Sequence, residues 1–351
     1  MSVADLVGTV SGNFGTRFSI VAILPSITFF IMLFGLIFSY TETPSVVPNL
    51  DALVSKIKSL DLLESVLVFV IIIVFSVIVH PLQLQIVRVF EGYWSEHKLI
   101  QPVTKIGKKI QEYRRRQLAE ASKVELRQYY PDEGELLPTS LGNVLRAAEV
   151  IAGRRYGFGT ATMWPRLYPL VSADLRSIID DQRNQRDAAV SFCVVFSIFT
   201  IISFIYYLAT VYAAAMTDFP INFILENSTP GQDPYANFYL IVNLAVKYSL
   251  WLVIPLFSAL LAWLSYKGAI SMALAYGKSI QVAFDFHRFD ILKALHLPLP
   301  NNLSEEKESN YDLSDFFALG QISNSLKNTP YSHSDVDTKN NIEKKDDAPI
   351  Q

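Results

Sequence analysis

Four long stretches of the sequence carry no charged side chain, and they constrain the fold more than any other feature. Residues 18–41, 65–87, 188–217 and 248–266 contain no Asp, Glu, Lys or Arg. A helix needs about 20 apolar residues to cross a hydrocarbon core of about 30 Å, and each stretch is about that long or longer. Because backbone polar groups must be paired inside lipid, these stretches are predicted to be transmembrane helices.

The average composition hides this division of the chain. Only 18% of the 351 residues are charged, against about 25% in soluble proteins, and 51% are hydrophobic. Buried helices of a soluble core are the alternative, but four such runs are too many for one core of this size. A single cysteine, Cys193, excludes a disulfide scaffold, and the net charge of −3 gives no basic character typical of nucleic-acid binding. We therefore expect an all-α polytopic membrane protein without a nucleic-acid partner.

We expect the four transmembrane helices to form two hairpins with a helical cytoplasmic domain between them. The hairpins and their spans are residues 18–83, with spans at about 18–40 and 65–83, and residues 188–266, with spans at about 188–212 and 246–266. The first span is too long for the apolar region of a cleavable signal peptide, which measures about 7–15 residues. It is therefore expected to be retained as a signal anchor.

Basic residues near the span ends predict the orientation, because cytoplasmic flanks are enriched in Lys and Arg. With both termini inside, the inner flanks hold eight such residues, Arg17, Arg88, Lys98, Arg176, Arg183, Arg186, Lys267 and Lys278. The outer connections hold only Lys56 and Lys58, and residues 213–237 carry three acids and no base. We expect a multi-pass protein of the plasma membrane with both termini in the cytoplasm.

Helical periodicity continues between the two predicted hairpins. Residues 1–17 are expected to be a cytoplasmic N-terminus and residues 84–187 the cytoplasmic helical domain. Within that domain Thr139 or Ser140 can cap a helix, because hydroxyl side chains accept from free backbone N–H groups at a helix start. The proline-containing and aromatic segment 164–169 is expected to be a rigid connector.

Two further helices are expected to continue into the second hairpin and out of it. Ser172 can cap a helix that runs unbroken into the third span, because no breaker follows it. Residues 267–300 are expected to extend the fourth span as a cytoplasmic juxtamembrane helix. Residues 301–351 are rich in Asn, Ser, Asp, Glu and Lys and are expected to form a disordered polar tail.

Charged residues before the third span have the spacing of helical ion pairs. Asp180 and Arg183 are three residues apart, and Arg183 and Asp187 are four apart. Such pairs stabilise a helix by about 0.2–0.5 kcal/mol each. We expect both pairs to form.

A basic cluster follows the second span. It consists of Lys105, Lys108, Lys109, Arg114, Arg115 and Arg116, offset by Glu112. On a juxtamembrane helix each cation can attract anionic lipid headgroups by about 1 kcal/mol near the surface. A solvated face that helps to fix the topology is the alternative. The expected partner is therefore the lipid bilayer, with its anionic headgroups as candidate ligands of this cluster.

Three polar residues lie in or beside the predicted spans. Lys247 interrupts an apolar run, and Asn243 lies one turn before it. A cation inside the bilayer is costly and marks a solute path or a partner acid, whereas the alternative is a side chain that reaches the outer interface. His80 is the only titratable side chain in the second apolar stretch, so it can either sense protons or simply lie at the interface.

The sequence carries no catalytic, cofactor or metal motif. Gly277-Lys278-Ser279 matches the end of a phosphate-binding loop, but Met272 stands where that motif requires glycine. The five histidines lack metal-ligand spacing, and one cysteine cannot build a zinc site. We therefore expect a non-enzymatic protein without a cofactor.

Several short motifs are spread over residues 65–300. They are HPLQ at 80–83, FEGYW at 90–94, LGNVLRAAE at 141–149, RYG at 155–157, WPRL at 164–167, FDIL at 289–292 and LPLP at 297–300. In these motifs the chain resembles an uncharacterised family of bacterial multi-span inner-membrane proteins. The resemblance implies a bacterial inner-membrane location and no particular activity.

The functional hypotheses follow from these features. Arg146, Glu149, Arg155 and Arg166 are predicted to form a buried polar network in the cytoplasmic domain. We expect a membrane anchor that binds a protein partner or a second copy of itself, or that relays a signal through the helix entering the third span. The alternative is an oligomeric channel or transporter subunit, for which Lys247 and Asn243 are the motivation.

Overall fold

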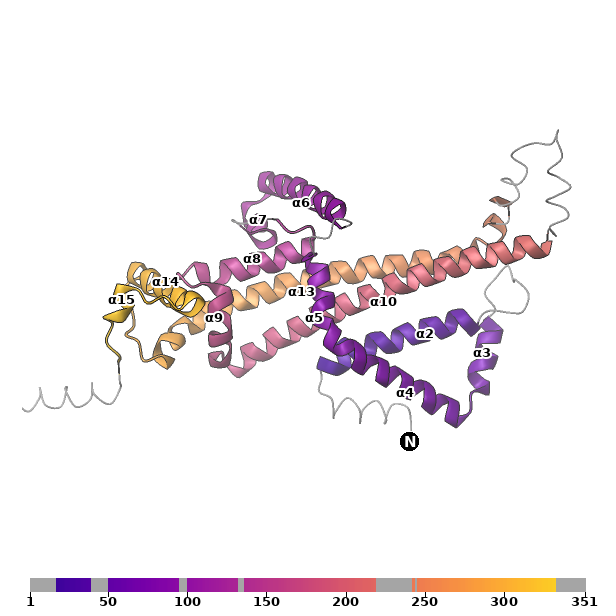
Figure 1. Ribbon diagram of the computed structural model, residues 1–351, viewed down its shortest axis with the longest axis horizontal. Helices are drawn as coiled ribbons and strands as arrows, with labels where there is room; N and C mark the ends of the chain where they lie inside the picture. Colours follow the sequence, from indigo (N-terminus) through magenta and orange to yellow (C-terminus); the bar gives the residue numbers. More distant parts are fainter. Residues whose placement is uncertain are drawn as a thin grey trace, which may run out of the picture. The chain divides into compact units, whose positions relative to one another are not determined.

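The computed structural model describes residues 17–38, 50–94, 100–131, 136–218, 242–243 and 245–332. These residues form helices and short connections and contain no strand, which confirms the all-α class (Figure 1). The chain divides into two units. We call Met1–Val89 with Asn184–Ala269 the apolar unit, and Phe90–Arg183 with Ile270–Gln351 the helical module.

Four helices are long and apolar enough to cross a membrane. They are Ser19–Phe38, Leu62–Glu91, Ala173–Ala214 and Leu250–Ala294, and each overlaps one charge-free stretch. Only 11–33% of the most apolar window of each helix is buried within the structure. Exposing the rest to water would cost about 25 cal/mol per Å², so this surface requires apolar surroundings. The prediction of a membrane protein with four candidate transmembrane helices is confirmed.

The N-terminal part of the chain, which belongs mostly to the apolar unit, is a run of helices. They are η1 (Ser19–Ile23), α2 (Leu24–Phe38), α3 (Leu50–Ser59), α4 (Leu62–Val79), η2 (His80–Leu82) and α5 (Gln83–Glu91). Asp61 and Glu64 start α4 with a capping box, in which each side chain accepts from the backbone N–H of the other residue. The ring of Phe75 on α4 lies 6.3 Å from that of Phe29 and 5.4 Å from that of Phe30 on α2, so these two helices pack together.

The helices α10 (Ala173–Asp218) and α13 (Leu250–Ala294) run through both units without a break. At about 1.5 Å per residue each is about 70 Å long, more than twice the hydrocarbon core of a bilayer. In the apolar unit they lie side by side, and Ser258 Oγ donates to the carbonyl of Phe196 at 2.9 Å (Figure 1). The expected unbroken helix after Ser172 is confirmed, and so is the continuation of the fourth span as far as Ala294.

The helical module adds shorter helices to these two. They are α6 (Gln101–Ala121), α7 (Lys123–Tyr129), α8 (Ser140–Arg154), α9 (Thr160–Leu167), η3 (Tyr168–Leu170), α14 (Leu303–Leu319) and α15 (Asn324–Lys327). Thr139 caps α8, because its Oγ1 accepts from the N–H of Gly142 at 3.1 Å. This decides between the two capping residues that the sequence allowed.

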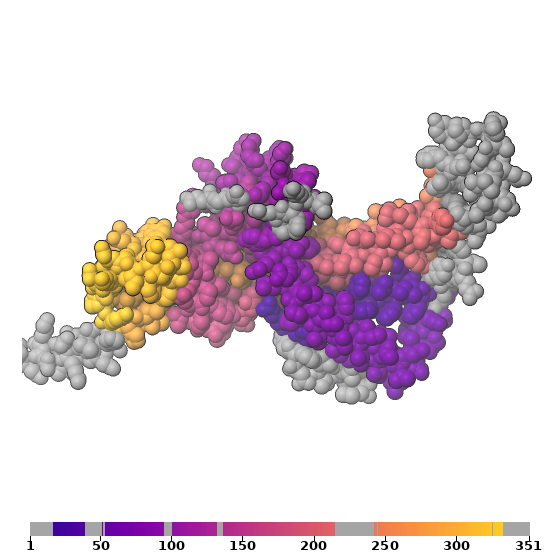
Figure 2. All heavy atoms as spheres, viewed as in Figure 1, coloured from indigo at the N-terminus to yellow at the C-terminus, as the bar shows by residue number. Residues whose placement is uncertain are grey.

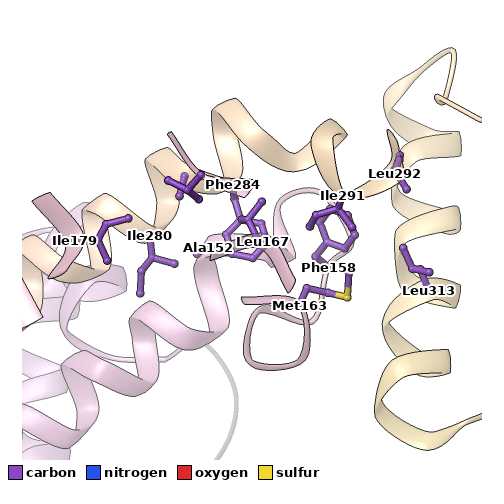
Figure 3. Close-up of a cluster of buried hydrophobic side chains, with 12 residues drawn as sticks. Ala152, Phe158, Met163, Leu167, Ile179, Ile280, Phe284, Ile291, Leu292 and Leu313 are labelled. Atoms are coloured by element: carbon purple, nitrogen blue, oxygen red, sulfur yellow. The ribbon is translucent and has the colours of Figure 1, made fainter. Parts of the chain in front are cut away.

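One apolar cluster forms the core of the module (Figure 3). Its buried side chains come from α8, α9, α10, α13 and α14 and from the connections between them, and they are Ala152, Phe158, Met163, Leu167, Val171, Ile179, Ile280, Ala283, Phe284, Ile291, Leu292 and Leu313. Because α10 and α13 contribute to this cluster and also continue through the apolar unit, the module core is built directly on two of the candidate spans.

Two predictions about the module are wrong. The segment 164–169 is a helix over most of its length, with Pro165 inside α9. Burial of Met163 and Leu167 on one face of α9 outweighs the hydrogen bond that Pro165 cannot donate. The stretch from 301 is not disordered throughout, because α14 packs on the module through the buried Leu313.

Local signals define α14 even though its composition is polar. The Asn302 side chain accepts from the N–H of Glu305 at 2.9 Å and caps the start of the helix. Gly320 has a φ of +69° and ends the helix in the left-handed conformation that glycine adopts without strain. The helix therefore needs only a few apolar side chains to hold it on the core.

Some predictions fall outside the described residues. They concern the N-terminal segment 1–16, Lys98, most of the acidic connection 213–237 and the end of the tail from 333. They stay predictions.

Phe284 and Phe286 offer a matched test of the module core on a single helix. Phe284 is 0% exposed in the core, whereas Phe286 is 75% exposed. We expect Phe284→Ala to lower the free energy of unfolding by about 3–5 kcal/mol, because it removes apolar contacts and leaves a cavity. Phe286→Ala should change it by no more than about 0.5 kcal/mol. Urea unfolding of the full-length protein in mild detergent measures both, and equal effects would contradict the described core.

Candidate functional site

The polar residues predicted for the spans lie at separate places. Lys247 and Asn243 are exposed in the apolar unit, and the Lys247 ammonium lies 5.5 Å from the ring centroid of Tyr248. His80 is half-buried at the start of η2, and the ring of Phe18 meets it edge-on at 5.0 Å. The buried Nδ1 of His80 has no hydrogen-bond partner among the described residues. Neither Lys247 nor Asn243 is enclosed within the apolar unit.

A buried carboxylate in the apolar unit joins two distant segments. The side chain of Asp187 on α10 is only 3% exposed, and its oxygens accept from Arg17 at 3.2 Å and from Arg186 at 2.7 Å. Two cations thus compensate one charge that would otherwise be costly to bury. Arg17 directly precedes the first candidate span, so this ion cluster attaches the start of that span to α10.

The structure corrects one expected ion pair and confirms the other. Asp187 pairs with Arg17 and Arg186, not with Arg183. Arg183 pairs with Asp180 at 3.0 Å, as its spacing predicted. Helical spacing alone missed the contact with Arg17, which comes from a segment 170 residues away. The only signal in the sequence is that Arg17 is the one cation directly beside the first apolar stretch.

The predicted network of Arg146, Glu149, Arg155 and Arg166 is not buried in the structure. Glu149, Arg155 and Arg166 are exposed, and Arg146 is half-buried. Arg166 donates to the carbonyl of Thr162 at 2.6 Å and lies 3.9 Å from the ring centroid of Phe317, so it holds α14 against α9. On α8, Glu149 is exposed because the buried side of that helix carries mainly small and apolar residues, among them Leu141, Val144 and Ala148.

A different polar network lies where α8, α13 and α14 meet. The Tyr156 hydroxyl donates to Asp285 at 2.5 Å, and Arg288 donates to the buried Glu306 at 2.8 Å. The guanidinium of Arg288 also lies 4.4 Å from the ring centroid of Tyr156, and the Asn310 amide donates to the Tyr156 carbonyl at 2.8 Å. The network therefore clamps α14 to the rest of the module.

Burial and then the hydrogen bond to Asp285 raise the pKa of Tyr156 above its ordinary value. The phenol is therefore neutral at neutral pH and acts as a hydrogen-bond donor. It carries no charge that would make it a base. The hydroxyl of Tyr156 contacts one carboxylate, that of Asp285, and its ring contacts the guanidinium of Arg288. Such contacts are typical of a point where helices are held together.

The basic cluster lies on α6, and the structure shows which face of that helix is covered. Gly107 packs so closely on Pro138 that a Cβ atom there would lie 2.7 Å from the proline side chain. On the same side the Gln111 amide donates to Ser140 at 3.1 Å and accepts from Tyr130 at 3.1 Å. These contacts fix α6 to the module by one face and leave the opposite face open.

The open face of α6 combines apolar and basic side chains. An exposed apolar stripe, spaced by three and four residues, consists of Val103, Ile106, Ile110 and Tyr113. By helical geometry Lys105, Lys109 and Arg116 flank this stripe on one side and Arg114 flanks it on the other. All four of these cations are exposed, whereas Lys108 and Arg115 are half-buried toward the module. Figure 2 shows α6 as the purple ridge at the top of the view.

Comparison with known proteins adds no further assignment. No family model, curated protein or solved structure matches the chain. The resemblance of residues 65–300 to bacterial inner-membrane proteins therefore stays a prediction. Within the part of the chain that the structure describes, no group of three or more His, Cys, Asp or Glu side chains is placed to hold a metal ion.

The buried ion cluster gives a specific expectation for Asp187. Asp187→Asn leaves the cations of Arg17 and Arg186 without their shared carboxylate; because the Arg17 side chain is 48% exposed and only Arg186 is largely buried, we expect a cost of about 1–3 kcal/mol. We expect a correspondingly lower midpoint in thermal unfolding of the detergent-solubilised protein. Glu112→Gln breaks the exposed pair with Arg116 and serves as the control, with an expected loss below about 1 kcal/mol. Equal losses would show that Asp187 is not the stabilising partner.

Proposed function

We propose that this chain is a non-enzymatic plasma-membrane protein that anchors a helical module and relays changes between the bilayer and that module. The observation that supports the relay is the continuity of α10 and α13. Both helices contribute buried side chains to the module core, Ile179 from α10 and Phe284 from α13. Both also pack against each other in the apolar unit. A continuous helix transmits rotation and translation along its axis, whereas a loop absorbs them.

The proposed topology has two transmembrane hairpins and both termini in the cytoplasm. The excess of Lys and Arg on the inner flanks supports this orientation. With it, the helical module faces the cytoplasm, where a protein partner or a second copy of the chain is the proposed contact. The resemblance to bacterial inner-membrane proteins supports the choice of membrane. The alternative of an oligomeric channel stays a prediction, and its motivation is still Lys247 and Asn243, both of which are exposed in the structure.

The relay is tested by changing the thickness of the bilayer. Thick and thin bilayers tilt or shift a span of fixed length. We expect the amide exchange rates of α9 and α14 to differ between nanodiscs of long-chain and short-chain lipid. Two glycines inserted after Arg183 interrupt α10 and should abolish this difference. The control is the same insertion after Gly320, which already ends α14 and should leave the difference intact. If the amide exchange rates of α9 and α14 in the unaltered protein are the same in both kinds of nanodisc, the relay is contradicted.

We further propose that α6 lies on the anionic surface of the same bilayer. The apolar stripe flanked by cations is the pattern of a helix that lies in the plane of a membrane surface. The chain also keeps α6 nearby: α5 ends a candidate span at Glu91, and α6 begins at Gln101. The nine intervening residues reach at most about 30 Å. Lipid contact on α6 would hold the module against the membrane.

Two single-cysteine variants test this contact in a Cys193→Ser background. A bimane label at Ile110→Cys reports from the apolar stripe, and a label at Ala119→Cys reports from an exposed position on the polar side of α6. We expect headgroup-level nitroxide lipids to quench the Ile110 label more strongly, and the difference to grow as phosphatidylglycerol replaces phosphatidylcholine in the nanodisc. Equal quenching at the two sites, or no dependence on anionic lipid, would disprove the proposed contact.

A further inference from the structure

A second group of cations in the module lines an open surface cavity of about 520 Å³. The cavity lies between α7, the end of α8 and the middle of α13. Its walls are formed by Lys123, Val124, Arg127, Gln128, Ile151, Arg154, Arg155 and Gln281. Four of these eight residues are basic and none is acidic, so the described lining carries charge of one sign only. The cluster predicted from the sequence, on α6, does not take part in it.

The arrangement of these cations favours an anionic ligand. A concave surface lined by one sign of charge focuses the electric field and raises the local concentration of the opposite charge. Three of the four cations are arginines, whose planar guanidinium groups bind phosphate oxygens through paired hydrogen bonds. Arg127 comes from α7 and Arg155 from the end of α8, so separate elements converge on the same space.

The size and the remaining lining narrow the class of ligand. The volume falls in the range of about 300–1,000 Å³ that is typical of small-molecule sites, and it exceeds what one inorganic phosphate fills. Val124 and Ile151 give an apolar wall, while the amides of Gln128 and Gln281 can both donate and accept hydrogen bonds. Phosphate groups attached to an organic part match this combination of walls.

We infer that this basic cavity is a binding site for a phosphorylated ligand with at least two negative charges. Arg127, Arg154 and Arg155 bind the phosphate groups, and the Val124–Ile151 wall contacts the organic part. A soluble phosphorylated compound and a phospholipid headgroup share this chemistry. The inference is independent of the proposed relay, because it depends only on the walls of the cavity within the helical module.

Calorimetric titration of the full-length protein with pyrophosphate tests the site. In phosphatidylcholine nanodiscs we expect saturable binding to the unaltered protein. The double variant Arg127→Gln/Arg155→Gln should raise the Kd at least tenfold. The matched control, Arg114→Gln/Arg116→Gln, removes the same two charges from α6 and should change the Kd less than threefold. Absence of saturable binding, or equal weakening in both double variants, would overturn the assignment.

Two additions complete the experiment. If the glutamine variant loses helicity, Arg127→Lys/Arg155→Lys keeps both charges and should still weaken binding several-fold, because lysine cannot form the paired hydrogen bonds. Unchanged affinity in this folded lysine variant would count against the arginine–phosphate geometry. Nanodiscs that contain cardiolipin, a lipid whose headgroup carries two phosphates, then separate the two sources. Competition with pyrophosphate identifies a lipid headgroup, whereas undiminished pyrophosphate binding identifies a soluble phosphorylated ligand.

Discussion

The requirement that every backbone polar group be paired inside lipid governs this structure. It forces each apolar stretch to be a helix. In α10 and α13 the helix does not stop at the end of the apolar stretch but continues through charged sequence into the module core. The module thus needs no separate scaffold, because two of its core elements are extensions of candidate spans. The short helices α8, α9 and α14 complete the core by covering the apolar sides of these extensions.

Features that depend on neighbouring residues could be predicted from the sequence. The four spans follow from the absence of charge, and the continuity of α10 follows from the lack of a breaker after Ser172. Features that depend on distant residues could not. Asp187 pairs with Arg17, which is 170 residues away in the sequence. Tyr156 donates to Asp285, which is 129 residues away. Helical spacing instead predicted a local partner for Asp187, because periodicity contains no information about which helices meet.

The helices α6 and α14 show the two ways in which composition misleads. On α6 the cations are obvious in the sequence, but only the contacts of Gly107 and Gln111 reveal that the apolar stripe is the open face. On α14 the polar composition resembles disorder, although a capping Asn302 and a terminal Gly320 delimit a helix that needs only Leu313 and a few polar contacts to pack. The candidate ligand cavity likewise could not be predicted from the sequence, because its arginines come from separate elements.

The unbroken course of α10 also restricts how the length of this protein can vary. Each residue of an α-helix turns the chain by about 100°, so one residue inserted between Ile179 and Val190 would rotate one buried face by more than a quarter turn relative to the other. Insertions of seven or eleven residues would restore the angle between the two buried faces to within about 20°. Related proteins that keep both packed faces should therefore differ in this segment by such whole-turn steps, while the surface connections are free to change length by single residues.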